Sequence, residues 1–204
     1  MLKKITLVVF IIVASNAKAQ ETHIKITEEK FRNRLSLYAE NHSETDYDVK
    51  IIVTGKNIRQ SARKPRFIRV PSASKVLLKT LILTRGKQPS YTYNLVINDS
   101  LSSRALKMPS VPIKIKPKKQ IIVYTTKDCI SCDSIIGSLS RSKYLFRSFS
   151  LSEKPLIRSR MAVALANTKT PLDSLRNPVI NLGGKLYIDI DNYDTLFERI
   201  NKEK

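Results

Sequence analysis

Short stretches of alternating or β-branched apolar residues recur along the first half of the chain, and polar turns separate them. The pattern predicts strands at 22–27, 34–40, 47–54, 75–83, 91–97 and 111–115. The segments between them are rich in Asn, Asp, Ser, Gly and Pro, which suit tight reversals. Six or seven short strands without a clear helix predict an all-β, immunoglobulin-like sandwich.

The pattern changes after Pro117, within a basic, proline-containing segment that suits a linker. From there the apolar spacing predicts strands at 121–124, 144–151, 179–182 and 186–190, and helices at 133–140, 154–166 and 193–201. Asp191 or Asn192 is the expected N-cap of the last helix. This order, a βαβ unit followed by a ββα unit, predicts an α/β domain over 118–204 after the β-sandwich domain over 20–117.

The first residues have the pattern of a secretory signal peptide. Lys3 and Lys4 precede an apolar run over 5–13, and Ala17-Lys18-Ala19 provides a small-residue cleavage site. We therefore predict a signal peptide over 1–19 and a periplasmic or extracellular mature protein, with an uncleaved N-terminal anchor as the alternative. No other apolar run reaches the length of about 20 residues that a membrane-spanning helix needs.

The positive charge is concentrated in the first half of the chain. The formal net charge is +20; residues 20–119 hold 21 basic and 8 acidic residues, whereas 120–204 hold 13 and 9. The densest basic segment contains Lys56, Arg59, Arg63, Lys64, Arg66 and Arg69. Export and the lack of a recognition helix argue against nucleic acid, so the expected partner is an anionic surface or an acidic protein. A solvated loop without any partner is the alternative.

The two cysteines of the chain, Cys129 and Cys132, carry the most specific signal. Segment 124–132 reads YTTKDCISC between a predicted strand and a predicted helix, and segment 177–185 reads NPVINLGGK. Together they resemble the active-site loop and the proline-headed hairpin of glutaredoxins and related thioredoxin-fold proteins. The resemblance covers about the last 85 residues and implies a thioredoxin fold of glutaredoxin-like type. It also implies a cis peptide at Pro178 and substrate pairing along the backbone of Asn177.

Thiol chemistry fits the same arrangement. A cysteine at a helix N-terminus is stabilised as a thiolate by free backbone N–H groups, which makes Cys129 the expected nucleophile. Lys127 would lower its pKa further. Cys132, one turn further into the helix, would resolve a mixed disulfide by attacking Cys129, so the pair would cycle between dithiol and disulfide.

The motif departs from the family in ways that affect the cofactor. Ile130 and Ser131 replace the usual dipeptides of glutaredoxins and thioredoxins, and residues 187–191 read YIDID where glutaredoxins carry glycines near glutathione. We therefore expect no cofactor, and direct exchange with protein thiols and disulfides rather than glutathione-coupled exchange. A separate redox partner would recycle the pair.

Other interpretations of the two cysteines stay open. A lone Cys-x-x-Cys can be half of a zinc site, but His23 and His42 lie far away in the other domain, so no metal ligands are expected. A copper-transfer domain and a structural disulfide are further alternatives, and Pro178 can instead be a trans turn proline. At the level of function, the sequence predicts an exported thiol–disulfide oxidoreductase acting on envelope proteins. The alternative is a non-catalytic binding module that uses the basic β-sandwich, with a loose resemblance to pilus chaperones.

Overall fold

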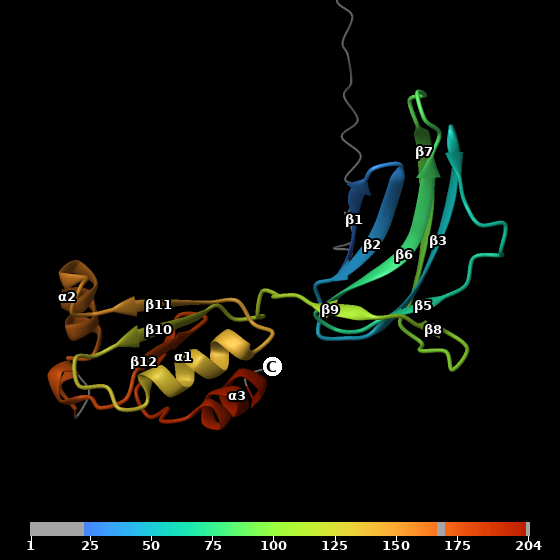
Figure 1. Ribbon diagram of the computed structural model, residues 1–204. Helices are drawn as coiled ribbons and strands as arrows, with labels where there is room; N and C mark the ends of the chain where they lie inside the picture. The colour runs from blue at the N-terminus through green and yellow to red at the C-terminus, as the bar shows by residue number, and fades with distance from the viewer. Residues whose placement is uncertain (1–22, 167–169, 203–204) are drawn as a thin grey trace, which may run out of the picture.

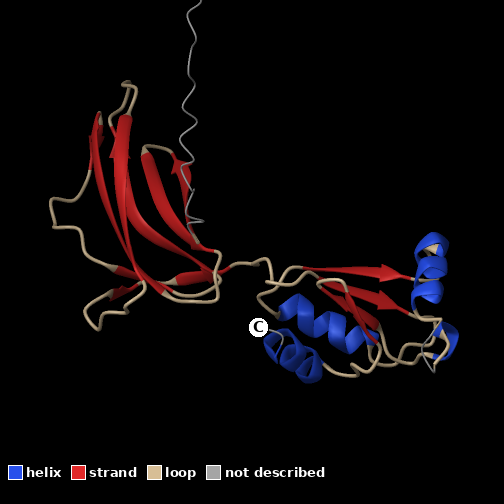
Figure 2. Ribbon diagram, turned by 180° about the vertical axis from the view of Figure 1, so that it is seen from behind, coloured by secondary structure: helices blue, strands red, loops and turns tan. Residues whose placement is uncertain are grey.

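The computed structural model describes residues 23–166 and 170–202, which form two lobes joined by a short extended segment (Figure 1). The first lobe consists of strands arranged as two sheets, and the second combines a third sheet with the helices (Figure 2). The predicted signal peptide, residues 1–19, lies outside the described residues.

The two sheets of the first lobe face each other across an apolar core. One sheet has the order β1-β2-β6-β4 with β9 also paired to β6, and the other has the order β7-β3-β5-β8. The strands are β1 Ile24–Phe31, β2 Arg34–Asn41, β3 Tyr47–Lys56, β4 Ile58–Arg59, β5 Ile68–Val70, β6 Ser74–Leu83, β7 Ser90–Asn98, β8 Leu106–Lys107 and β9 Ser110–Pro112.

Apolar alternation decides which side of each strand faces the core. In β6 the alternation is interrupted once, and a β-bulge compensates for the interruption. In β6, Leu78 and Leu81 are both buried although they lie three positions apart, which a regular strand with a period of two would not allow. The register between β2 and β6 shifts between Leu37 and Tyr38, where β6 carries one extra residue. This β-bulge returns the leucines of β6 to the core side.

The second lobe is built on a mixed four-stranded sheet of order β11-β10-β12-β13, in which β10 runs parallel to β11 and antiparallel to β12. Its elements are β10 Ile121–Thr125, α1 Cys132–Arg141, β11 Phe146–Ser150, α2 Pro155–Ala164, the short 3₁₀ helix η1 Leu172–Ser174, β12 Val179–Leu182, β13 Lys185–Tyr187 and α3 Tyr193–Lys202. Helices α1 and α3 lie side by side on one face of the sheet (Figure 1).

Both faces of this sheet bury apolar side chains. Ile121 and Val123 of β10 pack with Ile135 and Leu139 of α1 in one cluster. A second cluster packs Met161 of α2 and Leu172 of η1 with Val179 of β12. Helix α3 begins as predicted, because Oδ1 of Asn192 accepts a hydrogen bond of 2.8 Å from the backbone N–H of Thr195.

The fold class predicted from the sequence is wrong in its specific assignments. The described residues are mostly β, with 42% in strands and 19% in helices, arranged as three sheets and only three α-helices. β9 pairs with β6, and β8 pairs in parallel with β5, so the first lobe is all-β without the predicted immunoglobulin arrangement. A glutaredoxin-like βαβ-ββα thioredoxin fold is not evident as the class of the C-terminal part. The physical reason is that apolar spacing specifies local elements, whereas fold class depends on long-range pairing.

Residues 113–120, between β9 and β10, form the joining segment, which is hydrogen-bonded to both lobes. The backbone N–H of Ile113 donates to the Ala73 carbonyl of the first lobe at 2.8 Å, and the N–H of Ile115 donates to the Lys143 carbonyl of the second lobe at 2.8 Å. Ile115 is buried in the core of the second lobe. A side-chain hydrogen bond of 2.5 Å, from the Tyr144 hydroxyl to Oε1 of Glu44, also connects the lobes.

Candidate redox site

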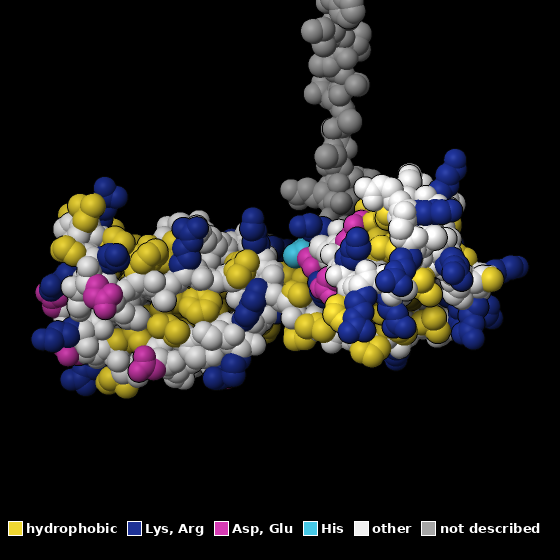
Figure 3. Space-filling view, turned by 45° about the horizontal axis from the view of Figure 1, so that its top comes forward, with side chains coloured by type: hydrophobic (Ala, Val, Ile, Leu, Met, Phe, Trp, Pro, Cys, Tyr) yellow, Lys and Arg dark blue, Asp and Glu magenta, His cyan; other side chains and the backbone are white. Residues whose placement is uncertain are grey.

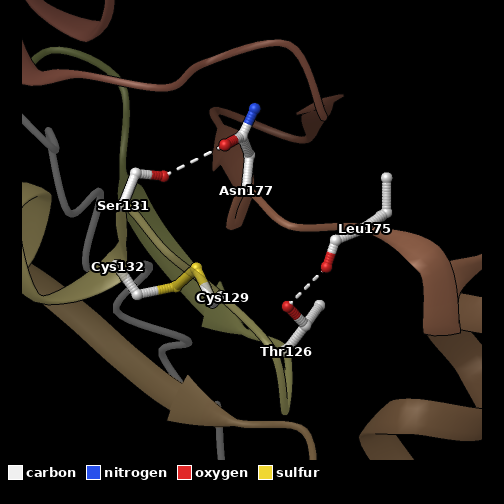
Figure 4. Close-up of a disulfide and its surroundings, with 6 residues drawn as sticks. All are labelled: Thr126, Cys129, Ser131, Cys132, Leu175 and Asn177. Carbon is white, nitrogen blue, oxygen red and sulfur yellow. Dashed lines mark hydrogen bonds between the residues drawn. A yellow bond between two sulfur atoms is a disulfide. The ribbon is translucent and has the colours of Figure 1, made fainter.

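The loop between β10 and α1, residues 126–131, holds Cys129, and we call it the cysteine loop. Cys129 forms a disulfide with Cys132, the first residue of α1 (Figure 4). Their Cα atoms lie 5.7 Å apart. The sequence analysis placed Cys129 at the helix N-terminus, but α1 begins at Cys132, and Cys129 lies in the loop two residues before the N-cap Ser131. Because the sulfurs are bonded to each other, the Sγ atom of Cys129 still lies beside the first turn of the helix, where unpaired N–H groups favour negative charge.

The two cysteines differ in exposure. Cys132 is buried, with 4% of its surface exposed, because it faces the core side of α1 together with Ile135. Cys129 is only half-buried, and its neighbour Ile130 is 75% exposed. An attacking molecule would therefore reach the sulfur of Cys129 before that of Cys132.

The segment before β12 holds the cysteine loop in place. The N–H of Ile130 donates to the carbonyl of Arg176 at 2.8 Å. The Thr126 hydroxyl donates to the carbonyl of Leu175 at 2.9 Å, and the Ser131 hydroxyl donates to Oδ1 of Asn177 at 3.2 Å (Figure 4). Three hydrogen bonds thus tie two loops that lie nearly 50 residues apart in the sequence.

Of the two residues predicted for a substrate groove, the structure places Asn177 against the cysteine loop. Pro178 follows it and is buried. The prediction of a cis peptide at Pro178 is wrong, because the described residues contain no cis peptide bond. The sequence could not decide the isomer, because the trans form of an X–Pro bond is favoured by only about 1 kcal/mol and tertiary contacts make the choice.

A hollow of about 310 Å³ opens beside the cysteine loop. Lys127 and Asp128 of the cysteine loop line it together with Arg158 and Asp173, which form an ion pair of 2.5 Å. Lys127 is exposed, and its influence on the Cys129 thiolate stays a prediction. The ion pair was not expected from the sequence, because its partners come from α2 and η1 and no local pattern relates them.

No cluster of three or more His, Cys, Asp or Glu side chains that could hold a metal ion occurs within residues 23–166 and 170–202. In the same part of the chain, no helix is long and apolar enough to cross a membrane.

The basic segment predicted to contact an anionic partner lies mostly on the surface of the first lobe. Lys56, Arg59, Arg63, Lys64 and Arg66 are exposed, and Figure 3 shows Lys and Arg side chains gathered on this lobe. Arg69 does not belong to this surface, which corrects the prediction. Its side chain is only 18% exposed because it is paired with the buried Asp48.

Comparison with protein-family models, with curated proteins and with solved structures finds no match for this chain.

Proposed function

We propose that the protein is a thiol–disulfide oxidoreductase whose redox group is the Cys129–Cys132 pair. The observation that carries the proposal is the asymmetry of the disulfide: Cys129 is half-buried in a loop, and Cys132 is buried at the start of α1. A nucleophilic thiol must be reached by its substrate, whereas a resolving thiol needs to reach only its neighbour.

The exchange runs as two displacements. In the reduced protein, the Cys129 thiolate attacks one sulfur of a substrate disulfide, and the other substrate sulfur leaves as a thiolate that takes up a proton. The Cys132 thiol then loses its proton and attacks Sγ of Cys129 in the mixed disulfide. The second substrate sulfur leaves, the substrate has gained two electrons, and the protein has lost two. The reverse sequence oxidises a substrate dithiol.

A purely structural role explains the pair less well. The disulfide closes a loop with a sequence separation of only 3. Because the entropy that a disulfide removes from the unfolded chain grows with loop length, so short a loop stabilises the fold little. The cysteine loop is already held by hydrogen bonds from Thr126, Ile130 and Ser131.

The proposal includes protein thiols and disulfides as substrates, a separate redox partner that recycles the pair, and an exported location. It includes no cofactor and no metal. The substrate would approach from the side of Cys129 and the exposed Ile130, and the hollow lined by Lys127 and Asp128 lies next to this side.

The test compares the wild-type protein with Cys129→Ser and Cys132→Ser in reducing a protein disulfide with a dithiol as electron source. Ser140→Ala, an exposed position at the far end of α1, serves as the control. We expect Cys129→Ser to abolish turnover. We expect Cys132→Ser, reduced beforehand and mixed with the substrate after the dithiol is removed, to accumulate a mixed disulfide that mass spectrometry detects. Equal rates in all four proteins would contradict the proposal.

A further inference from the structure

Three turns lie together at the upper end of the first lobe in Figure 1, and they connect β1 to β2, β3 to β4 and β6 to β7. We call residues 30–34, 56–58 and 83–89 the distal tip. Hydrogen bonds join the turns: the Leu83 N–H donates to the Asn33 carbonyl at 2.7 Å, the Thr84 N–H to the Asn57 carbonyl at 3.0 Å, and the Asn57 side-chain amide to the Gln88 carbonyl at 2.8 Å. The distal tip is therefore one connected surface.

A hollow of about 510 Å³ lies in the distal tip and is lined by four cationic side chains. These are Lys30, Arg32, Arg85 and Lys87. No Asp or Glu lines the hollow. Within the described residues, none of the four cations forms an ion pair, whereas Arg69 and Lys75 elsewhere in the lobe do. Uncompensated positive charge around a concave surface is complementary to a phosphate group.

Exposed apolar side chains lie beside cationic ones at the distal tip and on the strands next to it. Phe31, at the tip of the first turn, is 70% exposed, and the Arg32 guanidinium carbon lies 5.2 Å from the centre of its ring. Ile82 of β6 is 44% exposed, and the strand register places Arg34 on one side of it and Arg59 on the other. Figure 3, which brings the upper side of the lobe forward, shows Lys and Arg side chains interspersed with apolar ones there.

We propose that the distal tip docks on an anionic lipid surface. The hollow would take a headgroup phosphate between Lys30, Arg32, Arg85 and Lys87, and Phe31 would enter the interfacial layer. Lipid accounts for the combination better than a free phosphorylated molecule does. Cations alone suffice for a small anion, whereas an exposed aromatic residue beside basic ones is the pattern of membrane-interface anchors. The inference does not depend on the redox proposal.

The location of the distal tip suits a docking role. The cysteine loop lies in the other lobe. The joining segment and the Tyr144–Glu44 hydrogen bond lie between the distal tip and that loop. A lipid surface in contact with Phe31 would therefore leave the disulfide accessible to a second molecule.

The test measures co-sedimentation of the full chain with vesicles of phosphatidylglycerol and phosphatidylcholine, and with vesicles of phosphatidylcholine alone. The site variant is Arg32→Gln with Lys87→Gln. The matched control is Arg104→Gln with Lys107→Gln, which removes the same charge from exposed positions of the same lobe, outside both the hollow and the basic segment. We expect the site variant to weaken binding to the anionic vesicles about thirtyfold, and the control to change it much less. Phe31→Ser should weaken binding roughly tenfold.

Further arms separate lipid from other anions. Inorganic phosphate at constant ionic strength should compete only weakly, because it cannot replace the contact that Phe31 makes. Equal losses in the site variant and the control would show that net charge alone drives binding and would overturn the proposal. So would inorganic phosphate displacing the protein completely, or binding to duplex DNA that is tighter than binding to the vesicles. Circular dichroism of each variant checks that it is folded.

Discussion

Asp48 on β3 and Arg69 on β5 form an ion pair in which Nε of Arg69 lies 2.5 Å from Oδ1 of Asp48. The carboxylate is completely buried, and its Oδ2 atom also accepts a hydrogen bond of 2.6 Å from the backbone N–H of Ser102. Arg69 in turn donates to the Ser102 carbonyl at 2.8 Å. Two strands and the loop before β8 thus meet at one buried charge, so this end of the lobe depends on the pair remaining intact.

Removing the cation alone should destabilise the protein strongly. Arg69→Ala leaves the Asp48 carboxylate buried and unpaired, which typically costs about 3–5 kcal/mol. We expect urea unfolding to show a loss of this size. Arg66→Ala, an exposed arginine three residues away, is the control and should change the free energy of unfolding by about 0.5 kcal/mol or less. Similar values for the two variants would contradict a structural role for the pair.

The same pair makes stability depend on acid pH. Burial on its own would raise the pKa of Asp48, but the hydrogen bonds from Arg69 and Ser102 and the charge of Arg69 outweigh it, so the pKa lies below its ordinary value. The folded state then binds fewer protons than the unfolded state. The stability from Asp48 is therefore fully present above the unfolded pKa of about 3.9 and is lost as the pH falls through the folded pKa.

Asp48→Asn should lower stability at neutral pH and flatten its dependence on pH below about 4. Urea titrations of the wild type and the variant across that range measure both effects. Parallel curves for the two proteins would be evidence against this assignment.

The hydrogen bond between Tyr144 and Glu44 should contribute to the contact between the lobes. Burial raises the pKa of Tyr144, and the hydrogen bond to Glu44 and the charge of Glu44 raise it further. A raised pKa means that this stability is present below the unfolded tyrosine pKa of about 10 and is lost at higher pH. Tyr144→Phe should cost about 1.5 kcal/mol and reduce the alkaline loss of stability. Tyr93→Phe, at a 44% exposed position, is the control, and an equal cost there would argue against the contact.

Substitution of two glycines by alanine should change the stability of the protein in opposite directions. A Cβ atom at Gly55 would lie 2.6 Å from the Cβ of Tyr91 and even closer to the Ser90 carbonyl on the paired strand β7. Gly55→Ala should therefore separate β3 from β7 there and cost about 3 kcal/mol. At Gly137, in the middle of α1, the nearest atom is the flexible end of Arg141 at 3.5 Å. Gly137→Ala should stabilise the protein by about 1 kcal/mol, since alanine favours the helix. Thermal unfolding of both variants decides the matter.

Exposure predicts unequal reactivity of the two thiols after reduction. Iodoacetamide should modify Cys129 roughly tenfold faster than Cys132, because Cys132 is buried against the core. Mass spectrometry of the two alkylated positions over time measures the ratio, and urea-unfolded protein is the control in which the rates should converge. Faster labelling of Cys132 in the folded protein would reverse the proposed roles.

Local features were the part that the sequence predicted well. The apolar runs predicted strands such as β10 and β12, the N-cap of α3 is one of the two residues predicted for it, and the spacing of the two cysteines indicated their disulfide. Each of these depends on residues close together in the chain. The sequence could not show that Arg69 differs from the other basic residues of its segment, because its partner Asp48 lies 21 residues earlier.

The remaining features depend on distant residues. The Arg176 carbonyl that holds the cysteine loop is a backbone group with no sequence signature. The trans peptide at Pro178 and the pairing of β9 with β6 are likewise decided by tertiary contacts. A one-dimensional pattern of apolar residues therefore could not assign the fold class.

The backbone hydrogen bonds of Ile113 and Ile115 attach the joining segment to both lobes, so it differs from a flexible linker. A flexible tether would let the two lobes sample many relative orientations. A segment bonded to both lobes instead restricts the height and direction of the disulfide relative to the distal tip. If the tip rests on a membrane and the disulfide exchanges with other proteins as proposed, it would meet only proteins whose cysteines extend to that height. The geometry of the joining segment would then select substrates before any contact with Cys129 is made.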